Sequence, residues 1–194
     1  MKRVVFFISL VSIIFASCFS VPPRIKKEFR YCFDGEKTGL DTLINIKGYY
    51  APDTVIRESN KIFLKDTLRP AYIFYDNGFV EGNARISYYL EHEKLSFFAK
   101  RGGSFGRYVL HGDTIKLQYV TGPGGQSRDI AEMWFKIIDR NAIERIETKK
   151  TTPLSYVELP SYAERIFIFR PLEIKVKPEE TWIYNESWFR CKKK

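Results

Sequence analysis

From Gly48 onward, apolar and polar residues alternate in short runs separated by turn dipeptides, and this pattern constrains the fold most. The clearest run is RYVLHGDTIKLQYV, residues 107–120. If Gly112-Asp113 forms a two-residue hairpin turn, Leu110 pairs with Ile115 on an apolar face, and the other face is mostly polar. One face is therefore buried and the other wet, as in an antiparallel sheet. The apolar face also contains Tyr108, Leu117 and Tyr119.

Two further hairpins and several single strands have the same signature. AYIFYDNGFVEG, residues 71–82, turns at Asn77-Gly78, which is the strongest short-range hairpin signal. MWFKIIDRNAIERI, residues 133–146, turns through Asp139 to Asn141. Other segments favour strands by their β-branched and aromatic content. They are residues 61–65, 84–91, 94–100, 165–170 and a last segment around 181–190.

The number of strand signals and the absence of a sustained helical period define the fold class. About nine short strands joined by sequential turns predict an all-β protein, an antiparallel meander forming a barrel or a sandwich. No segment has the 3.6-residue period of an amphipathic helix, so we expect few and short helices. A chain of 194 residues fits one such domain after a leader is removed.

The order of these signals resembles that of lipocalin-like domains of small exported bacterial proteins. The residues that carry the resemblance are Gly48-Tyr49-Tyr50, where lipocalins have Gly-x-Trp, followed by strand pairs with tight turns at residues 76–78, 111–113 and 139–141. The resemblance covers about residues 45–148. It implies a lipocalin-like barrel with a ligand cavity.

The N-terminus has the layout of a secretory signal peptide. Lys2 and Arg3 precede an apolar run from Val4 to Phe15, which is too short for a membrane-spanning helix of about 20 residues. The run ends in Phe15-Ala16-Ser17-Cys18, which resembles the lipobox of bacterial lipoproteins. The resemblance implies cleavage after Ser17 and a diacylglyceryl thioether on Cys18.

The sequence therefore predicts that the chain has three parts. They are a signal peptide (residues 1–17), a lipidated Cys18 with a basic tether (18–44) and a single β domain (45–194). Since Phe19 is not an aspartate, we expect an outer-membrane, periplasm-facing lipoprotein. The alternative is an ordinary cleavable signal in which Cys18 is incidental.

The three cysteines are an odd number for an exported protein. If Cys18 carries lipid, Cys32 and Cys191 remain in an oxidising compartment, where disulfides form. A Cys32–Cys191 bond would join the start of the domain to its end. Two free thiols are the alternative.

Basic residues favour a membrane surface as a partner. The formal net charge is +9, and the segment after the two prolines contains Arg24, Lys26 and Lys27. Basic residues next to an anionic lipid surface contribute about 1 kcal/mol each. Solubility is the alternative role for these charges. Export and the lack of a nucleic-acid-reading motif argue against a nucleic-acid partner.

Motifs for catalysis or metal binding are weak. Gly102-Gly103-Ser104-Phe105-Gly106 fits G-x-S-x-G, but a hairpin follows it where a nucleophile elbow needs a helix, so we interpret it as a flexible loop. His92 and His111 lie at turns without further ligands, and no HExxH motif or cysteine cluster is present. We therefore expect no metal, no cofactor and no enzyme activity.

Two glycine-rich loops could form the rim of a barrel mouth, where binding residues are common. The candidate rim residues are Arg101, Ser104, Gln126 and Arg128. Flexible surface loops are the alternative. The leading hypothesis is a membrane-anchored β domain that binds an apolar small molecule or a periplasmic protein. The alternatives are a structural or assembly role, in which a strand edge or the stretch around Trp182 and Trp188 meets a partner, and an enzyme of unrecognised type.

Overall fold

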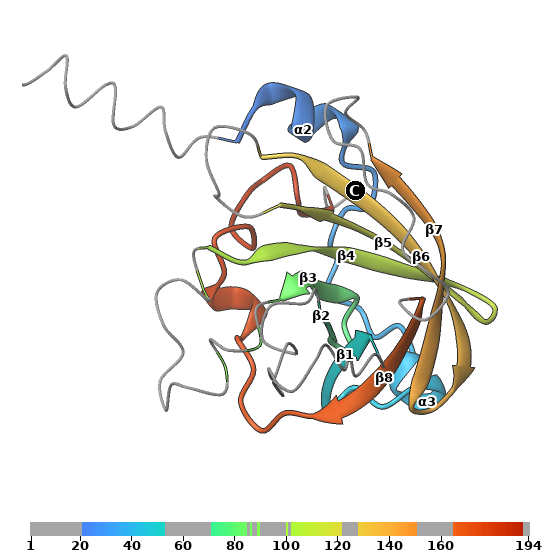
Figure 1. Cartoon of the computed structure of the whole chain (residues 1–194). Helices are drawn as coiled ribbons and strands as arrows, with labels where there is room; N and C mark the ends of the chain where they lie inside the picture. The colour runs from blue at the N-terminus through green and yellow to red at the C-terminus, as the bar shows by residue number, and fades with distance from the viewer. Residues whose placement is uncertain are drawn as a thin grey trace, which may run out of the picture.

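Eight antiparallel strands close into a barrel in chain order (Figure 1). The computed structural model describes residues 21–52, 71–84, 86, 89, 100, 102–121, 128–150 and 165–191. The predicted all-β fold is confirmed, and the closed sheet decides for a barrel over a sandwich. The strands are β1 (Gly48–Pro52), β2 (Ala71–Phe74), β3 (Phe79–Ala84), β4 (Ser104–His111), β5 (Thr114–Val120), β6 (Ile130–Asp139), β7 (Ala142–Lys150) and β8 (Ile166–Pro171).

The helical elements in the described residues are short, as expected. They are α2 (Pro23–Glu28), α3 (Leu40–Leu43) and the 3-10 helix η3 (Pro178–Glu180). Figure 1 shows α2 on the outside of the barrel beside β6, and α3 at the opposite end of the molecule. Both helices precede the first strand and therefore lie in the segment assigned to the tether from the sequence.

The meander gives the barrel two different ends. Tight turns join β2 to β3, β4 to β5 and β6 to β7 at one end, which we name the hairpin end. The connections β1–β2, β3–β4, β5–β6 and β7–β8 are longer, and all begin and end at the other end, which we name the loop end. Antiparallel neighbours in chain order make this division obligatory.

The three predicted hairpins are confirmed, and so is the register predicted for residues 107–120. Leu110 lies opposite Ile115, and Tyr108 lies opposite Leu117. The turn glycines Gly78 and Gly112 have positive φ angles of 86° and 61°. Glycine adopts this left-handed conformation at little cost, which is why it is preferred in two-residue hairpin turns.

The segment around α3 closes the hairpin end. Leu40 and Ile44 are fully buried in the interior core. The Tyr50 hydroxyl donates to the carbonyl oxygens of Asn45 and Arg140, both at 3.0 Å. The second tyrosine of Gly48-Tyr49-Tyr50 therefore fastens the incoming chain to the β6–β7 turn.

Aromatic side chains fill the barrel interior next to this closing segment. Ring centroids lie 5.9 Å apart for Tyr50 and Phe74, and 5.6 Å apart for Phe74 and Tyr108. Tyr72 lies next along the interior, with its ring 4.9 Å from Phe135. Such edge-to-face pairs add about 0.5–1.5 kcal/mol each beyond area burial.

Both ends of the chain cover the outside of β3 to β6. Phe105, Val120 and Ile130 form a row across the loop-end part of this wall. Val21 and Ile25 pack on this wall from one side and Ile183 and Phe189 from the other, in one buried cluster. The expectation that the outer face of the 107–120 hairpin is wet is wrong here, because Gln118 is only 1% exposed beneath this cover.

Residues 21–44 are thus part of the folded unit. The Arg30 backbone N–H donates to Gln118 Oε1 at 2.6 Å, and Gln118 Nε2 donates to the Glu28 carbonyl at 3.3 Å. Further along, Thr38 bonds to Asp76 of the β2–β3 turn. The segment runs down the wall from the loop end to the hairpin end.

Several segments predicted as strands are not strands in the structure or lie outside the described residues. At 84–91, Ala84 ends β3, Ile86 lies in a turn and Tyr89 in a helical turn, so the predicted strand is wrong at Ile86 and Tyr89. The other residues after Ala84 lie outside the described residues. The segment around 181–190 consists of turns with one bridge, Phe33 to Arg190, because the closed barrel leaves no edge and its aromatic residues pack on the wall instead. Residues 61–65 and all of 94–100 except Lys100 lie outside the described residues.

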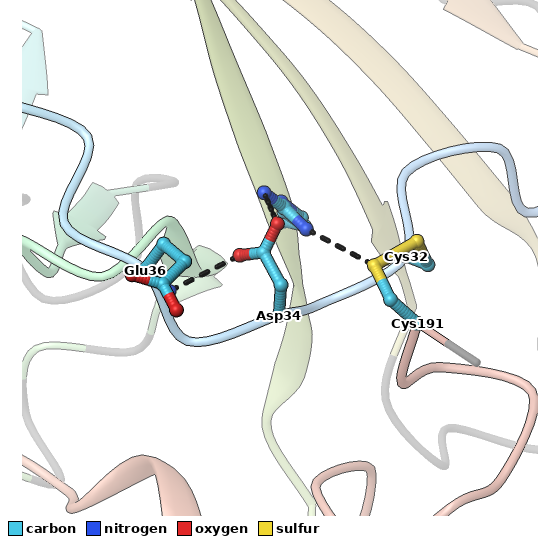
Figure 2. Close-up of a disulfide and its surroundings, with 5 residues drawn as sticks. Cys32, Asp34, Glu36 and Cys191 are labelled. Carbon is cyan, nitrogen blue, oxygen red and sulfur yellow. Dashed lines mark hydrogen bonds and ion pairs between the residues drawn. A yellow bond between two sulfur atoms is a disulfide. The ribbon is translucent and has the colours of Figure 1, made fainter. Parts of the chain in front are cut away.

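The predicted disulfide between Cys32 and Cys191 is confirmed, with a Cα–Cα distance of 4.8 Å (Figure 2). It lies beside Arg107, midway along β4, rather than at one end of the domain. The Arg107 guanidinium contacts Cys191 Sγ at 3.7 Å and forms an ion pair with Asp34 at 2.8 Å. Burial raises the pKa of Asp34, but hydrogen bonds from Arg107 and the Glu36 N–H outweigh it and hold the pKa below its usual value.

Candidate functional site

Four side chains from four strands meet inside the barrel on its loop-end side. We name Tyr72, Tyr119, Met133 and Arg145 the inner polar cluster. The Tyr72 hydroxyl donates to Met133 Sδ at 2.5 Å and is hydrogen-bonded to Tyr119 and to Arg145. The Arg145 guanidinium lies 5.6 Å from the ring centroid of Phe167. A positive charge is thereby placed among aromatic rings.

The electrostatics of the cluster follow from burial. Burial raises the pKa of Tyr72 well above its usual value, although Arg145 acts in the opposite direction. Burial also raises the pKa of Tyr119 to about 12, against the hydrogen bond from Tyr72 and the charge of Arg145. Both phenols are therefore neutral at physiological pH, and Arg145 supplies the formal charge of the cluster. Such a group suits the polar end of a largely apolar ligand.

Sequence reasoning missed this cluster. Tyr119 was recognised as part of an apolar face, but Tyr72 was treated only as a strand residue. Arg145 follows Ile143 by two positions, and Ile143 belongs to the interior core, so the two-residue period places Arg145 on the interior side. That alternation was the one signal available in the sequence.

The predicted rim residues are placed only in part. Ser104 is buried at the start of β4 and does not lie on an exposed rim. Arg128 lies 4.0 Å above the Trp182 ring, and Trp182 Nε1 donates to the Gly103 carbonyl at 3.0 Å. The two glycine-rich loops are thus joined through Trp182 on the outer wall. Arg101 and Gln126 lie outside the described residues.

The G-x-S-x-G stretch is not a flexible loop as expected. Ser104 to Gly106 belong to β4, and Gly82 pairs with Ser104 from the neighbouring strand. No helix follows, so the stretch lacks the strand-turn-helix geometry of a nucleophile elbow. Gly106 has a packing role, since its Cα faces the backbone of β5 at close range.

A second polar group is buried outside the barrel, under the segment that follows β3. The Glu81 side chain is 2% exposed and accepts a hydrogen bond from the Tyr89 hydroxyl. Burial raises the pKa of Glu81 to about 8, against this hydrogen bond, so the carboxyl is mostly protonated at neutral pH. Nearby, the Tyr75 hydroxyl donates to the Val176 carbonyl at 2.7 Å.

The buried Glu81 predicts a specific dependence of stability on pH. Its protonated form is favoured in the fold, so its contribution is complete below about pH 4.5 and is lost as the pH rises to about 8, with a slope of up to about 1.4 kcal/mol per unit. Urea unfolding across this range should give a smaller slope for Glu81→Gln than for the native chain.

The isosteric glutamine retains a hydrogen-bond partner for Tyr89 but cannot titrate, which makes it a matched control. Lys175, whose pKa burial lowers to about 8, makes a constant contribution below that pH and changes the pH dependence of stability only between about pH 8 and 10.5. Parallel curves for the native chain and Glu81→Gln would contradict the assignment.

Two hollows lie on the outer surface, and the polar residues named at the first already have partners. One, of about 830 Å³ at the hairpin end, contains Arg140 and Lys175. Arg140 donates to the carbonyls of Thr42 and Asp41, and Lys175 donates to those of Ile46 and Phe74. The other, of about 320 Å³, lies beside α2 and is lined by Glu28, Gln118 and Glu132.

In the part of the chain that the structure describes, no group of three or more His, Cys, Asp or Glu side chains could hold a metal ion. Within the same residues, no helix has the length and apolar character needed to cross a membrane. Comparisons with protein-family models, with curated proteins and with solved structures find no match. The barrel and its inner polar cluster are therefore the features that bear on function.

Proposed function

We propose that the protein is an exported, periplasm-facing lipoprotein, anchored through Cys18, whose barrel binds an apolar small molecule with an anionic group. The position of Arg145 inside an aromatic barrel is the observation that supports this class of ligand. The aromatic rings favour apolar surface, and the guanidinium favours a carboxylate or phosphate. Outer-membrane placement follows from Phe19 after the lipobox.

The barrel is asymmetric in a way that supports this proposal. Leu40, Ile44 and Tyr50 block the hairpin end. In the inner polar cluster, Met133 and Tyr119 lie nearer the loop end than Phe135, and Arg145 lies directly opposite Phe135. A ligand would therefore enter from the loop end with its anionic group directed at Arg145.

A partner-binding role through the C-terminal aromatic stretch has less support. Trp182 is held by Gly103 and Arg128. The Trp188 ring packs edge-on against Phe29 at 5.5 Å, and its Nε1 donates to Glu186. Because β1 pairs with β8, the barrel formed by the described strands has no free strand edge to offer a partner. Both surfaces named for an assembly role are used within the chain.

Oleate tests the ligand class, since it combines an apolar chain with a carboxylate. Isothermal titration calorimetry should show that Arg145→Met weakens oleate binding about tenfold, because a charge-assisted hydrogen bond is lost. Oleyl alcohol, which has the same chain without the charge, should bind both forms equally.

Arg170→Met is the matched control. Arg170 pairs with Tyr49, whose side chain packs on the outside of the barrel, so this arginine lies on the outer face. It should bind oleate like the native chain. Equal oleate affinity for all three forms, or no binding by the native chain, would refute the proposed ligand class.

The anchor is tested separately. Cys18→Ala removes the only thiol that the lipobox presents for lipidation, so the protein should lose radiolabelled palmitate and move from the membrane fraction to the soluble periplasmic fraction. Circular dichroism of the released protein should stay β-dominated. Unchanged membrane fractionation would show that Cys18 is not the anchor.

A further inference from the structure

The described chain begins at the loop end of the barrel. Val21 packs in the cluster that contains Phe105, Val120 and Ile130, and these three residues form the outer row nearest the loop end. Arg24 forms an ion pair at 3.2 Å with Asp129, the residue directly before β6. From there the chain descends the wall and reaches the hairpin end at Thr38.

The position of this starting point limits where a lipid anchor can hold the domain. Cys18 precedes Val21 by three positions, and an extended chain of that length reaches about 10 Å. The ten-residue strand β6 alone extends about 30 Å. A lipid on Cys18 would thus hold the loop end near the bilayer, while the hairpin end lies a barrel length further away.

The loop end, near the anchor, and the hairpin end, far from it, also differ in their charged residues. On α2, next to the anchor, Lys26 and Lys27 are exposed. Arg128 also lies there, but its guanidinium is stacked on the Trp182 ring and its Nη1 is buried, so it is not part of the exposed basic surface. The turns of the hairpin end carry aspartates instead. They are Asp76, Asp113 and Asp139.

An anionic bilayer attracts the first set of charges and repels the second. At the hairpin end, Lys37 lies 3.9 Å from Asp76 and Arg140 donates to two carbonyls. Lys47 and Lys136 are exposed there, but they lie far from the anchor. Basic residues contribute to membrane attraction only within about a Debye length of the surface, about 10 Å. Tether length and charge therefore favour the same orientation.

We propose that the loop end of the barrel docks on an anionic lipid bilayer through the exposed Lys26 and Lys27, so that the barrel interior faces the membrane. This inference rests on the proposed anchor at Cys18. The ligand of the inner polar cluster is then an anionic amphiphile that enters from the lipid phase rather than from the aqueous compartment.

Fluorescence quenching on vesicles tests the orientation. The lipidated protein is reconstituted in vesicles of phosphatidylglycerol and phosphatidylethanolamine that contain a headgroup-nitroxide lipid. A bimane label is attached at Arg165→Cys, directly before β8 at the loop end, or at Asp113→Cys in the β4–β5 turn. Native cysteines do not compete, because Cys32 and Cys191 are bonded to each other and a lipidated Cys18 has no thiol.

The loop-end label should be quenched at least threefold more than the hairpin-end label. Lys26→Glu/Lys27→Glu should reduce this ratio towards one, whereas the matched pair Lys47→Glu/Lys136→Glu, on exposed residues outside the docking surface, should preserve it. Phosphatidylcholine vesicles without anionic lipid should also lower the ratio.

The outcomes separate this inference from the proposed function. If the protein floats with the vesicles but both labels are quenched equally, or the hairpin-end label more, the orientation is refuted and the anchor stands. If the protein does not float with the vesicles, the anchor and the orientation both fail. If the Lys26/Lys27 variant keeps the full ratio, docking through these lysines is refuted.

Discussion

Replacing Gly106 by alanine is expected to destabilise the barrel by more than about 3 kcal/mol, or to prevent folding altogether. A Cβ atom at this position would lie 2.0 Å from the Gln118 carbonyl oxygen and 2.4 Å from Tyr119 Cα. Both atoms belong to the backbone of β5, so they can move only if the β4–β5 hydrogen bonds are distorted. Urea unfolding, or soluble yield if no folded protein forms, measures the effect.

Gly112→Asn is the control for this substitution. Gly112 has a positive φ of 61° but no atom within 4 Å of an added Cβ. Asparagine tolerates the left-handed conformation better than other residues with a side chain, so the cost should stay below about 1 kcal/mol. If Gly106→Ala were as mild as Gly112→Asn, the close approach of β4 and β5 would be wrong.

Removing the Cys32–Cys191 bond is the second substitution with a large expected effect. Cys32→Ser/Cys191→Ser should lower the free energy of unfolding by about 2–5 kcal/mol. The bond spans 159 positions, and it holds together the two chain ends that cover β3 to β6. Without it, the stacked rings of Phe33 and Phe189, 5.5 Å apart, must hold these ends.

Dithiothreitol gives a matched comparison for this variant. It should lower the melting temperature of the native chain to that of the double variant and leave the variant itself unchanged. Asp34→Asn, which weakens the neighbouring ion pair with Arg107 but retains the bond, should cost much less, since the pair is partly exposed. A double variant as stable as the native chain would mean that the chain ends pack independently of the bond.

The sequence predicted the parts of the fold that depend on short-range pattern. The register of Leu110 opposite Ile115 follows from alternation on both sides of a Gly-Asp turn, and the structure has the same pair. The Cys32–Cys191 pair was accessible from cysteine number and compartment alone. The segment around Trp182 failed as a strand because its rings fit the barrel wall and no strand edge remained to pair with.

The N-terminal cover and the inner polar cluster required three-dimensional information. Val21, Ile25 and Phe29 are spaced four residues apart, which is helical spacing, but the flanking lysines and prolines favoured a tether. The role of this apolar face becomes clear only in the structure, where it packs against the outer row that contains Val120. Arg145 was hidden for a different reason. A charge on an interior face contradicts the usual pattern, and its partner Tyr72 comes from a distant strand.

The pairing of β1 with β8 and of Phe33 with Arg190 has a consequence for biogenesis. A chain that leaves a translocation pore N-terminus first presents β1 long before its neighbour β8 emerges. Contacts of such sequence separation form slowly, because a long loop must close before they gain energy. The early strands would therefore keep exposed edges until the last residues leave the pore. Release of the chain before β8 pairs with β1 would favour aggregation. On the proposed export route, folding of this chain should thus depend on periplasmic chaperones more than that of a helical domain of equal length.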